Sequence, residues 1–185
     1  MLAEHLKKYK LTLDDWHQMI DAGIFADRNL EFIDGEIVAV TPEGAFHSVK
    51  VDTTSDRIKK IVGDLAYVRA AHPITLDNWE PEPDIALVKP PYKNYFTQNP
   101  TAEDVLLLIE MSDSTLNYDL TIKADRYAAN NIQEYWVADI RSQVMHVHSL
   151  PQGGKYQKVN QLKTGEIFIQ KLPGIKVDLS LLWEN

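Results

Sequence analysis

The sequence predicts an α/β (α+β) fold in which helices flank a mixed central β-sheet. The apolar run from Val105 to Ile109 suits a strand that is buried on both faces. Apolar spacing typical of helices occurs before this run, at 48–62, and after it, at about 117–130. Short apolar segments separated by turn residues indicate further strands on both sides of the run. Alternating strands and helices of this kind predict helices packed against a sheet.

Composition limits the class of protein. The chain has 185 residues, which fits a single domain spanning residues 1–185 with a core of its own. It contains no apolar run of about 20 residues and no start resembling a signal peptide, so we expect neither membrane insertion nor export. The absence of cysteine excludes disulfides and thiolate metal sites and fits a cytoplasmic protein.

The charge balance limits the class of partner. The formal net charge of the chain is −8. This charge argues against strong nonspecific binding of nucleic acid through a broad basic surface, although it leaves room for a local basic cleft.

Two elements are expected in the N-terminal part of the chain. Thr12 has the character of a helix N-cap, followed by a short amphipathic helix. Residues 30–40 predict a β-hairpin with an Asp-Gly type I′ turn at 34–35. In this register Glu31 lies among apolar residues on one face of the hairpin. Glu31 is therefore either a site residue or a solvent-facing charge that keeps the hairpin soluble.

His47 and Asp84 are polar residues next to expected elements. His47 directly precedes the helix at 48–62, and a lone histidine in such a place is usually structural or solvated. Asp84 leads into an apolar strand at 85–88, although an aspartate there could simply cap its own turn. The segment 89–100 is polar and aromatic, and we expect it to be a surface loop that could reach a substrate.

Glu110 is a carboxylate inside the buried strand. Without a partner, burying such a charge costs on the order of several kcal/mol, so it needs a cation or a proton. Lys123 shares the apolar face of the following helix and could supply the cation. A carboxylate and an ammonium that meet between a central strand and its helix suggest a metal-assisted hydrolytic site. The alternative for Lys123 is a surface pair with Asp119, four residues earlier.

The C-terminal part is expected to complete the sheet. Residues 132–139 predict a strand, and residues 144–159 predict a hairpin. His146 and His148 share one face of that hairpin and could bind a metal, but an exposed edge strand is the simpler interpretation. The sequence contains no glycine-rich phosphate loop and no zinc-ligand spacing.

Five segments of the sequence, taken in order, resemble one known family. They look like the bacterial family named putative restriction endonucleases, long catalogued as a domain of unknown function, within the PD-(D/E)XK nuclease superfamily. The resemblance covers about residues 11–183 and implies a restriction-endonuclease-like fold. The segments that carry it are LEFIDGEIV (30–38), EPDIALV (82–88), LLIEMSDST (107–115), YDLTIK (118–123) and IQEYWVAD (132–139).

The resemblance implies roles for individual residues. Asp84 corresponds to the aspartate of the P-D motif, and Glu110 to the second acidic ligand. Ser112 stands where the superfamily usually has its lysine. In this family the lysine has moved to the following helix, where it is Lys123, so the resemblance implies an intact but rearranged site. Lys123 would orient the attacking water, help to deprotonate it or stabilise the developing charge.

Further roles follow from the same resemblance. Glu31 would be an upstream acidic residue that holds a water or a second ion. His47 occupies a position where the family often has a histidine. The implied cofactor is Mg²⁺, with Mn²⁺ as a substitute, held by Asp84, Glu110 and the backbone carbonyl of Met111.

These implications predict a Mg²⁺-dependent endonuclease that hydrolyses phosphodiester bonds in DNA and makes no membrane contact. A homodimer is one expected assembly, because cutting two strands needs two sites. Two other functions remain open. One is a non-catalytic nuclease-fold module that serves in binding or assembly, and the other is a hydrolase for another phosphate ester.

Overall fold

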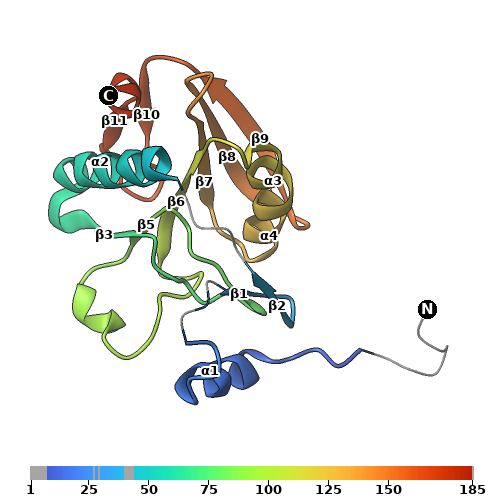
Figure 1. Cartoon of the computed structure of the whole chain (residues 1–185). Coiled ribbons are helices and arrows are strands. Elements are labelled where there is room, and N and C mark those ends of the chain that lie inside the picture. Colours follow the sequence, from blue (N-terminus) through green and yellow to red (C-terminus); the bar gives the residue numbers. More distant parts are fainter. Residues whose placement is uncertain (1–7, 27, 29, 40–43, 185) are drawn as a thin grey trace.

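The computed structural model describes residues 8–26, 28, 30–39 and 44–184. A mixed sheet forms its centre, with β6 and β7 parallel and the other neighbouring strands antiparallel. This sheet and its flanking helices confirm the predicted fold class. The sheet has six strands, in the spatial order β3 (Tyr67–Ala70), β5 (Ile85–Val88), β6 (Val105–Ser112), β7 (Glu134–Asp139), β8 (Val144–Gln152) and β9 (Lys155–Leu162) (Figure 1).

Strand β6 lies in the interior of this sheet, and all of its eight residues are buried. From Leu107 onward its side chains alternate between the two faces of the sheet, as the pleat of a strand requires. Ile109 and Met111 belong to the core that α2 (Ala45–Val62) covers. Leu108 belongs to the core that α4 (Ala124–Ala129) covers, on the opposite face (Figure 1). Glu110 alternates with Ile109 and Met111, so its side chain enters the α4 side.

The connection from β6 to β7 is a composite helix. It consists of α3 (Leu116–Tyr118), a π-helical turn η3 (Asp119–Lys123) and α4. The sequence predicted a regular helix at about 117–130. The predicted position was right, but the prediction of an uninterrupted α-helix was wrong. A π turn holds an extra residue, is rare, and occurs often at functional sites. Here it contains Lys123 and Asp119, two of the charged residues that meet β6.

The N-terminal elements follow the sequence closely. Helix α1 (Leu13–Asp21) begins after Thr12, whose side chain caps it as predicted. Strands β1 (Leu30–Ile33) and β2 (Glu36–Ala39) form the predicted hairpin, and β1 also pairs with β4 (Trp79–Glu80). Asp34 and Gly35 have φ values of 50° and 79°, the positive values that a type I′ turn needs.

The expectation that the C-terminal part completes the central sheet was wrong for its last two strands, because β10 (Glu166–Phe168) and β11 (Lys176–Asp178) pair with each other in a separate two-stranded sheet. Buried residues of the C-terminal elements join the core under α2. None of the helices in the described part of the chain has the length and apolar character needed to span a bilayer. The remaining elements are η1 (Gly63–Leu65), η2 (Tyr92–Tyr95) and α5 (Ser180–Trp183).

Two expectations about histidines were wrong. His47 lies inside the first turn of α2 rather than before it, because the helix already begins after Gly44, whose extended backbone forms the N-cap. Strand β8 is not an edge strand, because β9 folds back and pairs along it. His146 and His148 on β8 are consequently buried instead of exposed.

Candidate active site

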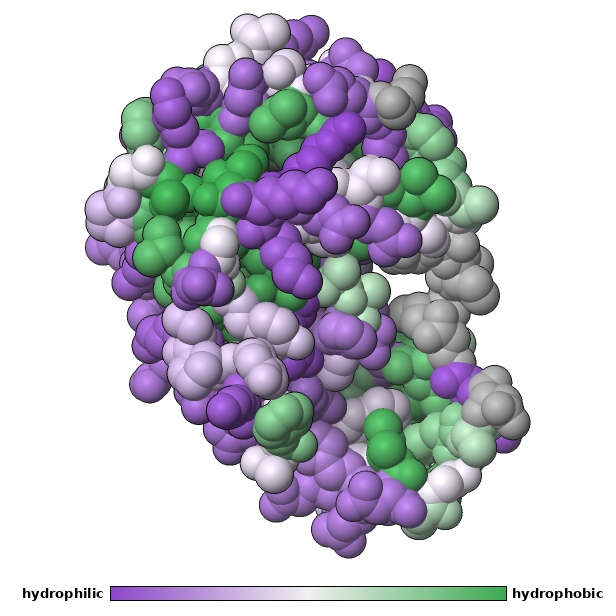
Figure 2. All heavy atoms as spheres, turned by 90° about the vertical axis from the view of Figure 1, so that its left-hand side faces the viewer, coloured by the Kyte–Doolittle hydropathy of each residue, from purple (hydrophilic) through white to green (hydrophobic). Residues whose placement is uncertain are grey.

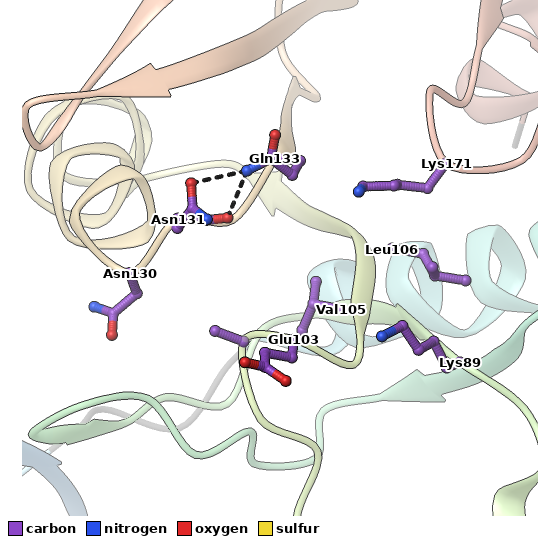
Figure 3. A pocket seen from close by; sticks show the side chains of 9 residues that line it. Lys89, Glu103, Val105, Leu106, Asn130, Asn131, Gln133 and Lys171 are labelled. Atoms are coloured by element: carbon purple, nitrogen blue, oxygen red, sulfur yellow. Dashed lines mark hydrogen bonds between the residues drawn. The ribbon is translucent and has the colours of Figure 1, made fainter.

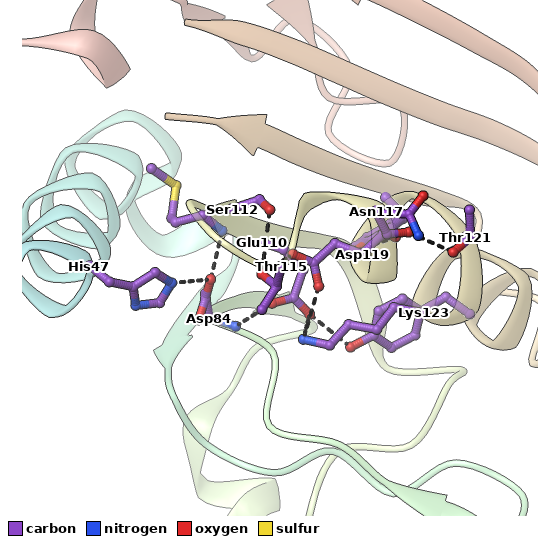
Figure 4. A network of polar contacts seen from close by, with 12 residues as sticks. His47, Asp84, Glu110, Ser112, Thr115, Asn117, Asp119, Thr121 and Lys123 are labelled. Atoms are coloured by element: carbon purple, nitrogen blue, oxygen red, sulfur yellow. Dashed lines mark hydrogen bonds and ion pairs between the residues drawn. The ribbon is translucent and has the colours of Figure 1, made fainter. Parts of the chain in front are cut away.

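Two carboxylates meet at one end of strands β5 and β6. The register pairs Ile85 with Ile109, which sets Asp84 beside Glu110. The backbone N–H of Asp84 lies 3.4 Å from Glu110 Oε2, and the N–H of Met111 donates to Asp84 Oδ2 at 2.6 Å (Figure 4). The structure therefore brings together the two acidic residues that the sequence singled out.

Lys123 reaches the same carboxylates from the composite helix. Its ammonium lies 3.0 Å from Glu110 Oε1 and 3.6 Å from Asp119 Oδ1. The hydroxyl of Tyr127 donates to Glu110 Oε1 at 3.1 Å. The side chains of Glu110 and Lys123 are only 3% and 16% exposed. Lys123 thus makes both of the contacts that were weighed as alternatives, and Asp119 belongs to a buried cluster instead of a surface pair.

The cluster carries surplus negative charge. Asp84, Glu110 and Asp119 contribute three carboxylates against the one ammonium of Lys123, which gives a formal charge of −2. Burial raises the pKa of Glu110 above its ordinary value, and the charges of Asp84 and Asp119 add to this rise against the opposing effect of Lys123. Burial alone would lower the pKa of Lys123, but the surrounding carboxylates raise it above its ordinary value. The ammonium therefore stays charged, and the carboxylates attract a proton or a cation.

His47 and Ser112 are two further residues near the acidic pair. His47 Nε2 lies 3.1 Å from Asp84 Oδ2, so α2 contributes to the site through its first turn. The buried hydroxyl of Ser112 lies 3.4 Å from that of Thr115, which donates to Asp119 Oδ2 at 2.6 Å. Ser112 thus contacts the residues that hold Asp119, and through them the surroundings of Lys123 (Figure 4).

Glu31 lies on β1, partly buried, on the hairpin that borders this region. Burial raises the pKa of Tyr127, and the negative charges of Glu110 and Glu31 raise it further. Glu31 is thus within electrostatic reach of the cluster. An ion pair of 2.6 Å between Arg126 and Asp34 ties the hairpin turn to α4.

A pocket of about 440 Å³ opens onto the cluster. Sequence reasoning treated Tyr127 as a core residue and did not identify Thr115 or Asp113. The sequence pointed to Asp119 only through its position four residues before Lys123. The lining residues are Gly44, Phe46, His47, Asp84, Glu110, Asp113, Ser114, Thr115, Asp119 and Lys123.

The donor atoms of this pocket suit Mg²⁺. In the described part of the chain, no three histidine, cysteine, aspartate or glutamate side chains form a ready-made metal cluster. Asp84 and Glu110 nevertheless offer hard carboxylate oxygens, and Mg²⁺ commonly takes one or two carboxylates and keeps several waters. The N–H of Met111 donates toward Asp84, so its carbonyl lies on the same side of the extended strand. The surplus negative charge also favours a divalent cation.

His146 and His148 give no support to a second metal site. Burial lowers the pKa of His148 to about 4, and aromatic rings of Tyr135 and Tyr156 pack against it. The pair belongs to the sheet core instead of a metal centre.

Comparisons with known proteins agree with the fold. No curated protein matches this chain. A solved structure described as a putative nuclease belonging to DUF820 from Anabaena variabilis ATCC 29413 matches with a TM-score of 0.71. The match covers 94% of this chain and 97% of that one, at 17% sequence identity, and so shows a shared fold. The model of the Uma2 family, described as "Putative restriction endonuclease", matches residues 13–181. Because that match spans most of its length, this chain belongs to the Uma2 family of restriction-endonuclease-like proteins.

Proposed function

We propose that this protein is a Mg²⁺-dependent endonuclease that hydrolyses phosphodiester bonds in DNA. The observation that carries the proposal is the convergence of Asp84, Glu110 and Lys123 at one pocket. Membership of a family described as "Putative restriction endonuclease" supports nuclease chemistry. DNA as the substrate would place the protein in the cytoplasm.

Asp84, Glu110 and the Met111 carbonyl would hold Mg²⁺, or Mn²⁺ in its place. When bound, the ion supplies Lewis-acid activation of water and neutralises charge on the phosphate. Lys123 is held as an ammonium by its carboxylate neighbours, which suits it to stabilise negative charge on the phosphate oxygens. The same contacts disfavour Lys123 as a base.

The neighbouring residues would orient these groups. His47 contacts Asp84 Oδ2 and fixes the direction of that carboxylate. Tyr127 and Asp119 hold Glu110 and Lys123 from the helix side. Glu31, whose charge acts on Tyr127, would hold a water or a second ion at the edge of the cluster.

Specific contacts also favour the alternative of a non-catalytic module with this fold. Glu110 Oε1 already accepts from Lys123 and Tyr127, and Asp84 Oδ2 accepts from Met111 N–H. With a net charge of −8 across the chain, the protein is poorly suited to bind DNA broadly. The same pocket could instead hydrolyse another phosphate ester. A homodimer would supply the two sites that double-strand cleavage needs.

Calorimetric titration with Mg²⁺ and Mn²⁺, followed by plasmid nicking, tests the proposal. Heat of binding should be present in wild type and in the control Glu166→Ala, whose exposed side chain pairs with Lys176. The double variant Asp84→Ala/Glu110→Ala should lose it. Nicking should require the metal and should disappear in Lys123→Ala. Metal binding without nicking would favour another phosphate ester, and no metal binding at millimolar concentration would favour the non-catalytic module.

A further inference from the structure

Four aromatic rings contact one another on β3 and around η2, and we name them the aromatic platform: Tyr67, Tyr92, Tyr95 and Phe96. Tyr67 stacks on Tyr95 with ring centroids 6.2 Å apart and an angle of 11° between the planes. Tyr67 also lies 6.0 Å from Tyr92, which meets Phe96 edge-on at 5.8 Å. The rings therefore form one continuous surface cluster.

The outer rings of the platform are exposed, and the inner rings are held in place. Phe96 is 76% exposed and Tyr92 is 51% exposed, which is high for side chains of this size. Tyr95 donates its hydroxyl to the carbonyl of Lys89 at 2.8 Å, and the guanidinium of Arg69 lies 6.0 Å from its ring. Figure 2 looks onto the side of the molecule that carries β3 and η2. Clustered exposed aromatic surface of this kind commonly marks a binding site.

Three lysines without a carboxylate partner among the described residues lie on η2 or in a hollow next to the platform. Lys93 belongs to η2, and Lys89 and Lys171 extend into an adjoining hollow of about 520 Å³ (Figure 3). None of these three ammoniums pairs with a carboxylate of the described residues. Glu103 is the one carboxylate that lines the hollow within the described ranges. The charge of Asp104 also acts on Tyr95. Three lysines and Arg69 against Glu103 and Asp104 still leave a local excess of positive charge in an acidic chain.

We propose that the aromatic platform and the adjoining hollow bind single-stranded DNA. Bases would stack on Phe96 and Tyr92, and phosphates would lie near Lys89, Lys93 and Lys171. Aromatic faces next to cations are what sequence-tolerant binding of single strands requires. In a duplex the base faces are stacked on one another, so they are not available to the aromatic rings. The choice of DNA rests on the proposed function.

This site is separate from the catalytic pocket. Lys89 follows the end of β5 opposite to Asp84, and five residues of extended chain span about 17 Å. A single strand could contact both ends of β5, with its bases on the platform and a phosphate near Asp84. The inference therefore adds a preference for unpaired DNA to the proposed nuclease.

Fluorescence anisotropy with a labelled oligothymidylate tests the inference, in EDTA so that metal-dependent cleavage cannot alter the probe. Phe96→Ala and Tyr92→Ala should each weaken binding by about 5- to 150-fold. Phe168→Ala is the matched control, because Phe168 is 61% exposed on β10 and outside the platform. Lys93→Gln and Lys171→Gln should reduce the salt dependence of binding, whereas the aromatic variants should leave it unchanged.

Several outcomes would overturn the inference. The first is that Phe96→Ala binds the oligonucleotide as tightly as wild type. The second is that Phe168→Ala loses as much affinity as Phe96→Ala. The third is that Phe96→Ala weakens binding of duplex DNA as much as binding of the single strand. Loss of self-association in Phe96→Ala with oligonucleotide binding intact would assign the platform to a second copy of the chain. Nicking without a binding role for Phe96 would refute the platform alone, and binding through Phe96 without nicking would refute the proposed activity alone.

Discussion

Replacing Lys123 with methionine removes the ammonium that pairs with Glu110 and keeps much of the aliphatic stem. In the native protein the two charges lie 3.0 Å apart and are nearly buried. Removing one partner of a buried pair typically costs about 3–5 kcal/mol, because the other charge remains buried. Lys123→Met should therefore lower the free energy of unfolding substantially.

Uptake of a proton by Glu110 limits this loss. A glutamate with the ordinary pKa of 4.5 needs about 3.4 kcal/mol to be protonated at pH 7, at about 1.4 kcal/mol per pH unit. The expected loss at pH 7 is therefore about 3 kcal/mol. Because the folded protein binds a proton that the unfolded chain releases above pH 4.5, the stability of Lys123→Met should fall as the pH rises above that value.

Urea denaturation of Lys123→Met, Glu110→Gln and the double variant measures this coupling. The double variant should be less destabilised than Lys123→Met, because a neutral amide leaves no buried charge. Lys155→Met serves as the control, since Lys155 forms an exposed pair with Asp125 and its loss should cost about 0–1 kcal/mol. The reasoning would be refuted if the losses of stability from the two single substitutions were strictly additive. It would also be refuted if Lys123→Met lost as much stability relative to wild type at pH 5 as at pH 7.5.

Two further predictions concern the hairpin turn and the sheet core. Gly35→Ala places a Cβ 2.9 Å from the carbonyl oxygen of Leu11 at a positive φ, whereas Gly153→Ala at φ +60° meets nothing within 4 Å. Urea midpoints should show a loss of about 1 kcal/mol for Gly153→Ala and a clearly larger one for Gly35→Ala, and equal losses would contradict the clash. Burial lowers the pKa of His148 to about 4, so its contribution to stability is complete above pH 6.5 and is lost as the pH falls toward 4, by at most about 1.4 kcal/mol per unit. His148→Phe should flatten this part of the stability profile, and an unchanged profile would show that other groups produce it.

Local sequence was sufficient for the elements whose signals are short-range. The apolar run at 105–109 predicted a strand buried on both faces, and β6 is completely buried. The Asp-Gly pair at 34–35 predicted the hairpin register that the structure shows. Glu110 was identifiable because a charge inside such a run requires a partner, and Lys123 because it shares the apolar face of the next helix.

Features that depend on distant contacts were not predictable in the same way. A regular period of 3.6 residues gives no reason to expect a π turn at Asp119–Lys123. The alternation of His146 and His148 fits an edge strand, and only the pairing of β8 with β9 shows that both are buried. The contact of His47 with Asp84 depends on how α2 packs on the sheet.

The position of Lys123 shows how packing brings together charges that are distant in the sequence. Ser112 lies two residues after Glu110, so its side chain starts from the same face of β6, but it is buried against Thr115. Lys123 approaches Glu110 from the facing helix and brings Asp119 with it through the π turn. The ammonium position is therefore set by the packing of η3 and α4 on β6. Spacing along the strand alone would leave Glu110 without a cation, whereas packing brings the Lys123 ammonium to 3.0 Å from its carboxylate.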